Sequence, residues 1–159
     1  MSTPIDILLV EDDPGDVLMT REAFEHYKIR NELHVATDGI EAVKFVRNEP
    51  PYENAPRPGL ILLDLNMPRK DGREALAEIK ADAELRDIPV VVLTASKADE
   101  DFWRARNLGA DMYLVKPVTF ETLVNVTRSL GRYWFEIVEI QAAPDPEPAR
   151  SGDNALRVA

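Results

Sequence analysis

Residues Leu60 to Gly72 read LILLDLNMPRKDG, and this stretch decides the fold. Four large apolar residues precede Asp64, and proline-bearing turns stand on both sides, at Pro58-Gly59 and Met67-Pro68. An apolar run of this length between turns is typical of a strand that is buried on both faces in a parallel sheet. Because ligands of open α/β sheets bind beyond the carboxyl ends of the strands, Asp64 falls where we expect the chemistry.

The composition fits one domain with a full-size core. The chain has 159 residues, of which 45% are hydrophobic, and its formal net charge is -10. A charge of this sign repels the phosphate backbone, so we expect no direct binding to nucleic acid. The absence of cysteine excludes disulfides, thiolate catalysis and cysteine-ligated zinc. His26 and His34 lack the spacing of a metal-binding pair.

The sequence predicts neither a signal peptide nor a membrane span. The N-terminus, MSTPID, lacks the basic start and apolar core of a signal peptide, and no apolar stretch is long enough to span a membrane. We therefore expect a cytoplasmic protein without membrane contact. The tail over 142–159 is rich in Pro and small polar residues and is predicted to be disordered, which leaves a folded domain over 1–141.

Strand patterns and helix patterns alternate along the chain. Asp13 is a suitable N-cap, Pro14 suits the first helical position, and Asp16 lies in the first turn, where the helix dipole favours a carboxylate. The predicted strands are Ile5 to Val10, Leu33 to Ala36, Leu60 to Leu63, Ile88 to Leu93 and Met112 to Val115. Predicted helices start at Asp13-Pro14 and Thr37-Asp38-Gly39 and span Gly72 to Ala81, Lys97 to Leu108, and Thr119 to about Gln141.

Five strands that alternate with five helices predict a doubly wound parallel sheet. One connection in this pattern is unusual. The stretch Asn48 to Gly59, NEPPYENAPRPG, contains four of the twelve prolines and is predicted to be a loop. It is long for a connection between a helix and a strand.

Polar residues follow four of the predicted strands at one edge of the sheet. Glu11 and Asp12 follow the first strand, Asp64 the third, Thr94 the fourth and Lys116 the fifth. Three converging carboxylates raise one another's pKa unless a cation lies among them, and oxygen ligands without His or Cys suit Mg2+. Beside such an ion Asp64 is a plausible nucleophile, and Thr94 and Lys116 can contact the oxygens of a transferred phosphoryl group. The set predicts an aspartyl phosphate at Asp64.

Each of these residues has a simpler explanation when it is taken alone. Acidic residues after a strand often cap helices, as Asp13 does, and Asp64 could cap its own loop. Thr is common at strand ends, and a lysine such as Lys116 is usually a solvated surface charge. The combination favours function, because unrelated surface residues rarely all fall at strand carboxyl ends.

The segments VEDDP, LLDLNMPRKDG, VVVLTA and YLVKP resemble the receiver domains of two-component response regulators, over residues 5 to about 135. The resemblance implies a flavodoxin-like (βα)5 fold, Mg2+ dependence, and phosphoryl transfer from a sensor histidine kinase to Asp64. It also implies a phosphoacceptor signalling domain, with only slow self-catalysed phosphotransfer and dephosphorylation, and not an enzyme that turns over added substrates.

The resemblance implies a metal role for four residues. Glu11 and Asp12 correspond to the family's acidic pair, with Asp12 as the direct metal ligand. Asp64 is the phosphoacceptor and a ligand. Asn66, two residues later, corresponds to the position that binds metal through its backbone carbonyl.

Five further residues match the family's switch and supporting positions. Thr94 corresponds to the switch hydroxyl, and Tyr113 to the aromatic residue that turns inward when Thr94 engages the phosphoryl group. Ala95 corresponds to the small neighbour that leaves this group room. Lys116 corresponds to the family's lysine, and Pro117 to a residue that follows a cis peptide bond.

Features outside these motifs resemble the stand-alone regulators that are paired with bacterial and cyanobacterial phytochromes. They are the long loop Asn48 to Gly59, the continuation of the last helix through RYWFEIVEI, and the segments KDGREALAEIK and DIPVVVLTAS. This closer resemblance implies a red-light-sensing histidine kinase, a bacteriophytochrome, as phosphodonor. It also implies a homodimer that is built on the fourth and fifth helices.

The last predicted helix carries two apolar stripes that cannot both face one small core. The second stripe, which provides most of the candidate dimer surface given below, could be ordinary exposed surface. Its aromatic residues favour a partner interface instead. Because only a short, slightly negative tail follows, we expect output through dimerisation or another protein contact and not through DNA. The core stripe is Phe120, Leu123, Thr127, Leu130 and Trp134. The candidate dimer surface is Val126, Tyr133, Trp134, Ile137 and Ile140.

Three alternatives to a receiver stay open. An aspartyl-phosphate hydrolase usually needs a second Asp two residues after the nucleophile, and this chain has Asn66 there. A flavodoxin-like cofactor binder needs a Gly/Ser/Thr-rich loop after the first strand, where Glu11, Asp12 and Asp13 would repel a cofactor phosphate. A scaffold that never accepts phosphate is the third.

Overall fold

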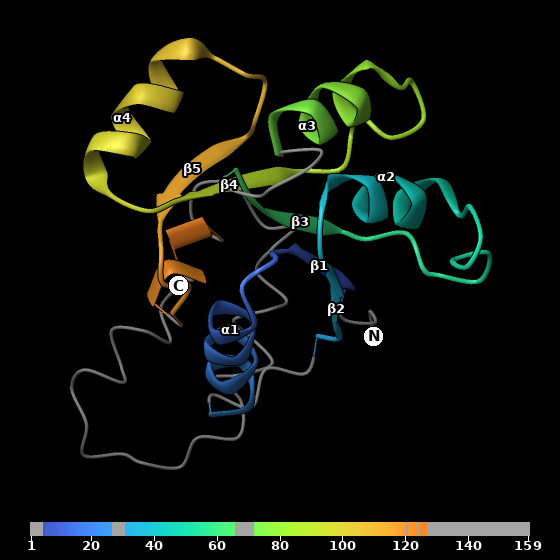
Figure 1. Ribbon diagram of the computed structural model, residues 1–159, viewed down its shortest axis with the longest axis horizontal. Coiled ribbons are helices and arrows are strands. Elements are labelled where there is room, and N and C mark those ends of the chain that lie inside the picture. The colour runs from blue at the N-terminus through green and yellow to red at the C-terminus, as the bar shows by residue number, and fades with distance from the viewer. Residues whose placement is uncertain (1–4, 27–30, 66–71, 120, 124, 127–159) are drawn as a thin grey trace.

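Five parallel strands form one sheet in the computed structural model, which describes residues 5–26, 31–65, 72–119, 121–123 and 125–126 (Figure 1). The strands are β1 (Ile7–Val10), β2 (Leu33–Ala36), β3 (Leu60–Asp64), β4 (Val90–Thr94) and β5 (Met112–Val115). Their order across the sheet is β2-β1-β3-β4-β5. This order places the switch point between β1 and β3, where ligands of doubly wound sheets bind. The predicted doubly wound parallel sheet is confirmed.

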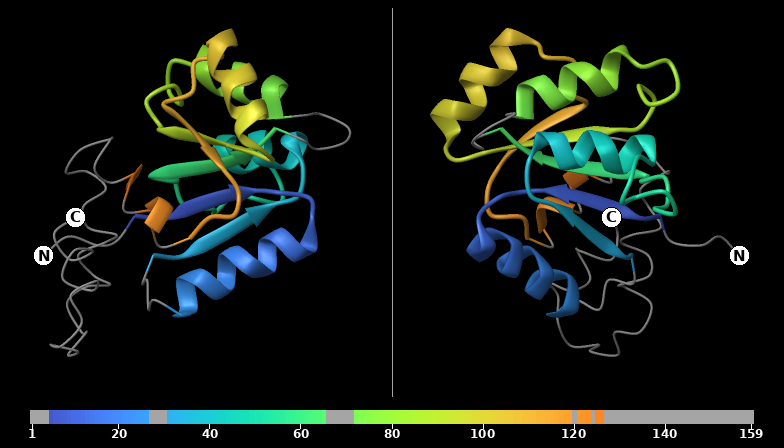
Figure 2. Two further views of the ribbon diagram at one scale, coloured as in Figure 1. Left: turned by 90° about the vertical axis from the view of Figure 1, so that its left-hand side faces the viewer. Right: turned by 45° about the vertical axis from the view of Figure 1, so that its right-hand side comes forward.

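Helices cover both faces of the sheet. The helices are α1 (Pro14–His26), α2 (Gly39–Arg47), α3 (Gly72–Ala81) and α4 (Lys97–Arg106). Helix α1 lies on one face, together with the short helical segments at 121–123 and 125–126, and α2, α3 and α4 lie on the other (Figures 1 and 2).

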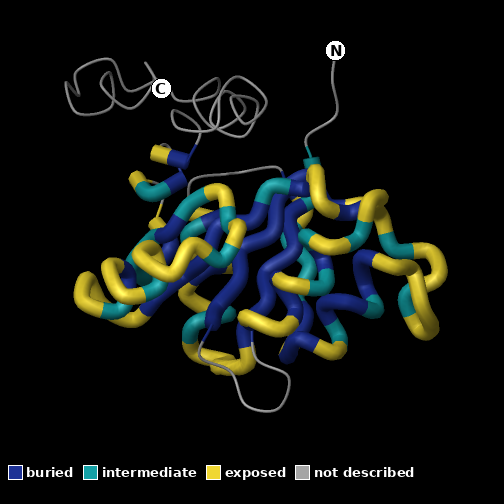
Figure 3. The backbone as a smooth tube through the Cα atoms, turned by 90° about the horizontal axis from the view of Figure 1, so that it is seen from above, coloured by how far each residue is buried: buried dark blue, intermediate teal, exposed yellow. Residues whose placement is uncertain are grey.

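Burial on two sides explains the continuous apolar runs of the central strands. Every residue of β1, β3 and β4 is buried, and these strands form the dark centre of Figure 3. Ile7 and Leu9 point into the core on the α1 side, whereas Leu8 and Val10 point into the core under α2 and α3. A strand with a core on each side has no polar face, so alternation is absent from LILL and VVVL.

Side-chain caps fix where the helices begin. Asp13 Oδ1 accepts a hydrogen bond from the Gly15 N–H at 2.9 Å, and Asp38 Oδ1 accepts one from the Glu41 N–H at 2.9 Å. The hydroxyl of Thr119 accepts from the Thr122 N–H at 3.2 Å. The predicted starts of these helices are confirmed.

Three predicted boundaries were wrong by two residues. Strand β1 begins at Ile7 and not at Ile5. Helix α4 ends at Arg106 and not at Leu108, because Asn107 has a left-handed backbone with φ of 52°. Strand β4 begins at Val90 and not at Ile88. Pro89 lies directly before β4 and has no N–H to donate to a neighbouring strand.

The long loop over 48–59 contains no helix or strand, as the sequence predicts. Asn48 organises it, because its Nδ2 donates to the carbonyls of Tyr52 at 3.1 Å and Ala55 at 2.8 Å. The Tyr52 hydroxyl donates to Glu41 Oε1 at 2.6 Å, and this hydrogen bond is the main cause that raises the pKa of Tyr52 to about 12. The loop is thereby tied to α2.

One residue of the candidate dimer surface was misplaced. Val126 is only 1% exposed and packs in the core with Val118 and Leu123. It lies three residues after Leu123 and therefore shares that face of a helix, which the sheet covers. The other residues of the candidate dimer surface lie outside the described residues, and they are Tyr133, Trp134, Ile137 and Ile140. The predicted helix end near Gln141 and the predicted tail lie outside them too.

Gly72 permits a close approach between α3 and the end of β3. A Cβ atom at this position would lie 2.7 Å from the carbonyl oxygen of Asp64 and 3.0 Å from the Cα of Leu65. We expect Gly72→Ala to lower the free energy of unfolding by about 1–3 kcal/mol, because backbone atoms must shift. Urea unfolding measures the difference.

Gly15→Ala is the matched control. A Cβ atom at Gly15 meets only Asp13 Oδ1, at 3.4 Å, and alanine suits a helix better than glycine. We expect this variant to be as stable as the wild type or more stable. Equal losses in the two variants would contradict the close approach at Gly72.

Candidate functional site

Three carboxylates gather at the carboxyl edge of β1 and β3. Each of Glu11, Asp12 and Asp64 offers an oxygen that lies within 4.8 Å of the other two. The register causes this, since Val10 pairs with Leu63 on the neighbouring strand and the next residue of each strand is acidic. Glu11 and Asp64 are buried, whereas Asp12 is exposed. The structure thus brings together the acidic residues that the sequence singles out.

Burial makes this cluster electrostatically unfavourable without a cation. The pKa of Glu11 rises to about 8, first because burial disfavours the charged form and then because of the hydrogen bond and the charge of Asp64. The Asp13 backbone N–H, which donates to Glu11 Oε2 at 3.2 Å, and the charge of Lys116 act in the opposite direction. A divalent cation beside the three carboxylates would relieve the remaining repulsion.

Lys116 supplies the positive charge of the pocket. It follows β5, and its side chain reaches past β4 to the carboxylates of β1 and β3. Its Nζ lies 3.3 Å from Asp64 Oδ2, 3.4 Å from Glu11 Oε1 and 2.7 Å from Asp16 Oδ2. Burial by itself lowers the pKa of Lys116, but the hydrogen bond to Asp16 and the three carboxylate charges outweigh it and raise the pKa. The lysine is therefore a permanent cation.

Thr94 lies at the end of β4 with its hydroxyl directed across the sheet. The hydroxyl donates to the carbonyl of Leu114 on β5 at 2.9 Å, and the carbonyl of Ser96 lies farther away, at 3.4 Å. The side chain is 1% exposed. To contact a group on Asp64, the hydroxyl must give up its bond to β5.

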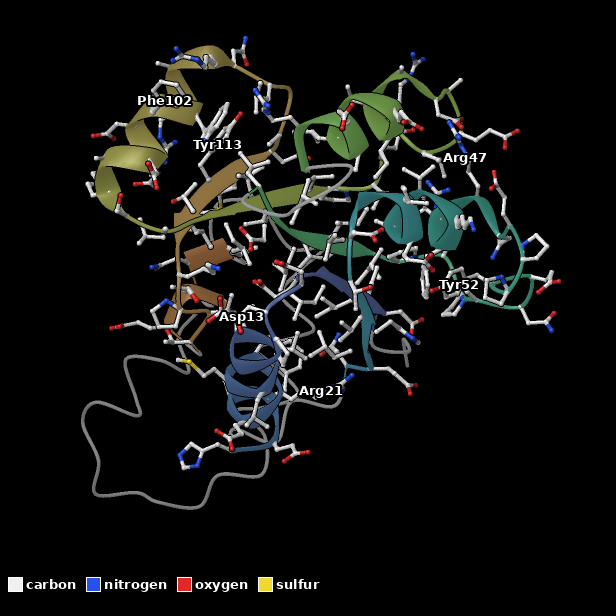
Figure 4. The ribbon with its side chains drawn as sticks, in the orientation of Figure 1. Asp13, Arg21, Arg47, Tyr52, Phe102 and Tyr113 are labelled. Atoms are coloured by element: carbon white, nitrogen blue, oxygen red, sulfur yellow. The ribbon has the colours of Figure 1, made fainter. Side chains whose placement is uncertain are left out.

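Tyr113 is buried between β5 and α4 (Figure 4). Its hydroxyl accepts a hydrogen bond from the Leu108 N–H at 3.1 Å. The Arg104 guanidinium lies 5.6 Å from the ring centroid and donates to the Tyr113 carbonyl at 3.2 Å. Arg104 also pairs with Glu100 at 2.9 Å. These contacts hold the ring inward.

The other predicted positions are placed as follows. Ala95 is exposed directly after Thr94. The peptide bond between Lys116 and Pro117 is cis, as the resemblance implies. Asn66 lies outside the described residues. Sequence reasoning missed the contact of Asp16 with Lys116, because Asp16 is explained equally well as a first-turn acidic residue of α1.

The donor set fits a hard divalent cation. The ligand atoms of the cluster are carboxylate oxygens only, which Mg2+ and Mn2+ prefer to nitrogen or sulfur. Two of the three carboxylates are buried, so water screens their attraction for such an ion only weakly. Figure 4 shows Asp13 at the start of α1, and its carboxylate is not among the three that form the cluster.

Residues 7–128 match the family described as the response regulator receiver domain. The chain belongs to this family. The receiver fold and the predicted family resemblance are therefore confirmed. Among the residues that the structure describes, no helix is both long and apolar enough to cross a membrane.

The receiver is similar to a response regulator of nearly its own length. Response regulator Rcp1 of Synechocystis sp. is 43% identical over 137 residues, which make up 86% of this chain and 93% of Rcp1. A Mn(2+)-bound structure of Rcp1 covers 85% of this chain and 97% of its own, with a TM-score of 0.66.

Two further solved structures show the same relationship. The bacteriophytochrome response regulator AtBRR is 40% identical, with a TM-score of 0.76 over 82% of this chain and 94% of its own. The phosphorylated cyanobacterial phytochrome response regulator RcpA is also 40% identical, with a TM-score of 0.67 over 84% of this chain and 95% of its own. The predicted resemblance to phytochrome-associated regulators is confirmed.

Metal binding can be tested with two neighbouring charge-removing variants. We expect Asp12→Asn to weaken the affinity for Mg2+ or Mn2+ about tenfold or more, because it removes one ligand charge from the cluster. Asp13→Asn removes the same charge one residue away and keeps the helix cap, because Asn caps as well as Asp. Calorimetric titration should show near wild-type affinity for Asp13→Asn. Equal weakening in the two variants would show that Asp12 contributes only its long-range charge.

Proposed function

We propose that this receiver accepts a phosphoryl group on Asp64 from a sensor histidine kinase and signals through a protein contact. The observation that carries the proposal is the buried Asp64 carboxylate, with Lys116 Nζ at 3.3 Å and two further acidic residues within 4.8 Å. A structural salt bridge needs one carboxylate per lysine. Lys116 contacts three carboxylates, and Asp12 adds a fourth beside Glu11 and Asp64, so one ammonium does not balance the negative charge of the site.

The chemistry follows from these groups. An oxygen of Asp64 attacks the phosphorus of a phosphohistidine, the new P–O bond forms as the P–N bond breaks, and the departing imidazole nitrogen keeps the bonding electron pair and takes up a proton. Lys116 donates to an equatorial oxygen of the transferred group, where charge accumulates. Mg2+, held by Glu11, Asp12, Asp64 and the Asn66 carbonyl, would supply the charge that balances phosphoryl and carboxylate oxygens.

A bacteriophytochrome is the phosphodonor that the relatives favour. Rcp1 is a response regulator, AtBRR is described as a bacteriophytochrome response regulator, and RcpA as a cyanobacterial phytochrome response regulator in phosphorylated form. Within this proposal the receiver works in the cytoplasm, which holds the ATP that histidine kinases use.

Output through a homodimer fits the contacts around Thr94. Its hydroxyl now binds the carbonyl of Leu114, the residue after Tyr113. When Thr94 turns to a phosphoryl oxygen, β5 loses this bond next to the tyrosine that packs against α4. Phosphorylation thereby biases the surface of α4, β5 and the last helix, which we propose as the dimer contact.

Intact mass tests the phosphoacceptor. After incubation with acetyl phosphate and Mg2+, we expect a gain of about 80 Da that disappears when the metal is chelated. Asp64→Asn should show no gain, because an amide does not form the acyl phosphate. Asp13→Asn, which leaves the ligand set intact, should gain the same mass as the wild type.

Two results would contradict the proposal. A wild-type protein that gains no mass with acetyl phosphate or with a bacteriophytochrome kinase is not a phosphoacceptor. Rapid turnover of an added phosphate ester at Asp64 would instead assign the site to a hydrolase.

The coupling of Asp64 to the dimer can be measured by sedimentation equilibrium. We expect the dimer dissociation constant to change at least about fivefold between the free and the phosphorylated wild type, a typical coupling between two sites. Thr94→Val keeps the shape of the side chain and removes the hydroxyl. We therefore expect the dimer dissociation constant of this variant to be the same before and after phosphorylation, compared at the same phosphoryl occupancy as the wild type. An unchanged wild-type constant at full occupancy would show that the dimer does not report phosphorylation.

A further inference from the structure

The closest partner of the Lys116 ammonium is Asp16 and not the phosphoacceptor. The Nζ atom lies 2.7 Å from Asp16 Oδ2, but 3.3 Å from Asp64 Oδ2 and 3.4 Å from Glu11 Oε1. The first distance is that of a strong charge-assisted hydrogen bond, and the other two exceed the usual range of about 2.7–3.2 Å. Asp16 is therefore the strongest hydrogen-bond partner of the ammonium.

Asp16 is well placed for such a role. It lies in the first turn of α1, five residues after Glu11, and its side chain is about one-third exposed, at 32%. The lysine side chain is 20% exposed. Partial burial weakens screening, so the attraction between the two charges is stronger than in a surface ion pair.

The pocket has as many carboxylate partners as the ammonium has donors. A lysine ammonium has three N–H groups, and Asp16, Glu11 and Asp64 each provide one acceptor. The strongest of the three bonds pulls the ammonium toward α1. The contact with Asp64 stays long, so that the positive charge is near the nucleophilic oxygen without being bound closely to it.

We propose that Asp16 is a positioning residue for phosphoryl transfer, which holds the Lys116 ammonium on the α1 side of the pocket. Without Asp16 the ammonium would move onto Asp64 and Glu11, where it would neutralise the attacking carboxylate. With Asp16 in place, the ammonium stands beside the point where the transferred group arrives. This inference rests on the proposed function, because it concerns the rate of phosphorylation at Asp64.

Two alternatives predict different results. If Asp16 only complements the dipole of α1, its removal changes stability and leaves the rate constant of phosphorylation unchanged. If Asp16 only adds negative charge near the pocket, removal of the neighbouring charge of Asp13 has the same effect on the rate. Only a positioning role predicts that phosphorylation slows when Asp16 is replaced but not when Asp13 is replaced, and that this slowing requires Lys116.

The experiment measures the rate constant of mass gain with acetyl phosphate at saturating Mg2+. We expect Asp16→Asn and Asp16→Ala to slow phosphorylation about five- to tenfold, because a misplaced catalytic group costs rate. The matched control is Asp13→Asn, which removes one charge from the same helix start and keeps its cap. Its rate constant should be close to that of the wild type. Thermal unfolding confirms that all variants are folded.

A second comparison uses Lys116→Met, which keeps an unbranched side chain as far as Cε and removes the ammonium. In this background we expect Asp16→Asn to cause no further slowing, because the group that it positions is absent. The proposal is overturned if Asp16→Asn and Asp13→Asn have the same rate constant in the presence of Lys116. It is also overturned if Asp16→Asn slows the Lys116→Met protein by the same factor as the wild type.

The wild-type result separates the two levels of inference. If the wild-type protein gains no phosphoryl group at Asp64, the proposed function fails, and the role of Asp16 fails with it. If the wild type is phosphorylated and the Asp16 variants match the Asp13 control, the proposed function stands and only the role of Asp16 is wrong.

Discussion

The attraction between Lys116 and the three carboxylates that contact it is the interaction on which the rest of this site depends. Burial of Glu11 and Asp64 would be costly if each had to stay charged without a partner, and the rise of the Glu11 pKa to about 8 shows that cost. Lys116 offsets part of the negative charge, but a single ammonium cannot balance the cluster. The remaining imbalance is what makes the pocket receptive to a divalent cation, and a phosphoryl group can then share that cation.

Strand pairing and core packing hold the carboxylates of this cluster together although they repel one another. The pairing of Val10 with Leu63 places Glu11 beside Asp64, and the packed core on each face of the sheet fixes the two strands relative to one another. Gly72 brings the start of α3 against the carbonyl of Asp64. The pocket is therefore held by the same packing that stabilises the core, so changes in the core near Asp64 also move the site.

Hydrogen bonds connect Thr94 and Tyr113 to β5, to α4 and to the turn between them. Thr94 binds the Leu114 carbonyl, and the neighbouring Tyr113 is held by the Leu108 N–H and by Arg104. Tyr113 lies inward in this structure while the Thr94 hydroxyl donates to the Leu114 carbonyl. Arg104, which pairs with Glu100 within α4, contacts the Tyr113 ring and carbonyl and so connects this tyrosine to α4.

The sequence by itself determined the strands, the helix caps, and the order of polar residues at the strand ends, because apolar runs and capping residues act over a few neighbouring positions. It also predicted that Glu11, Asp12, Asp64 and Lys116 would meet, since parallel strands end at one edge. Only the tertiary structure decided that Val126 packs into the core and that Asp16 is the closest partner of Lys116. Asp16 and Lys116 are 100 residues apart in the chain. Such a contact depends on how the start of α1 and the end of β5 are placed in space, and no local sequence pattern specifies the distance between them.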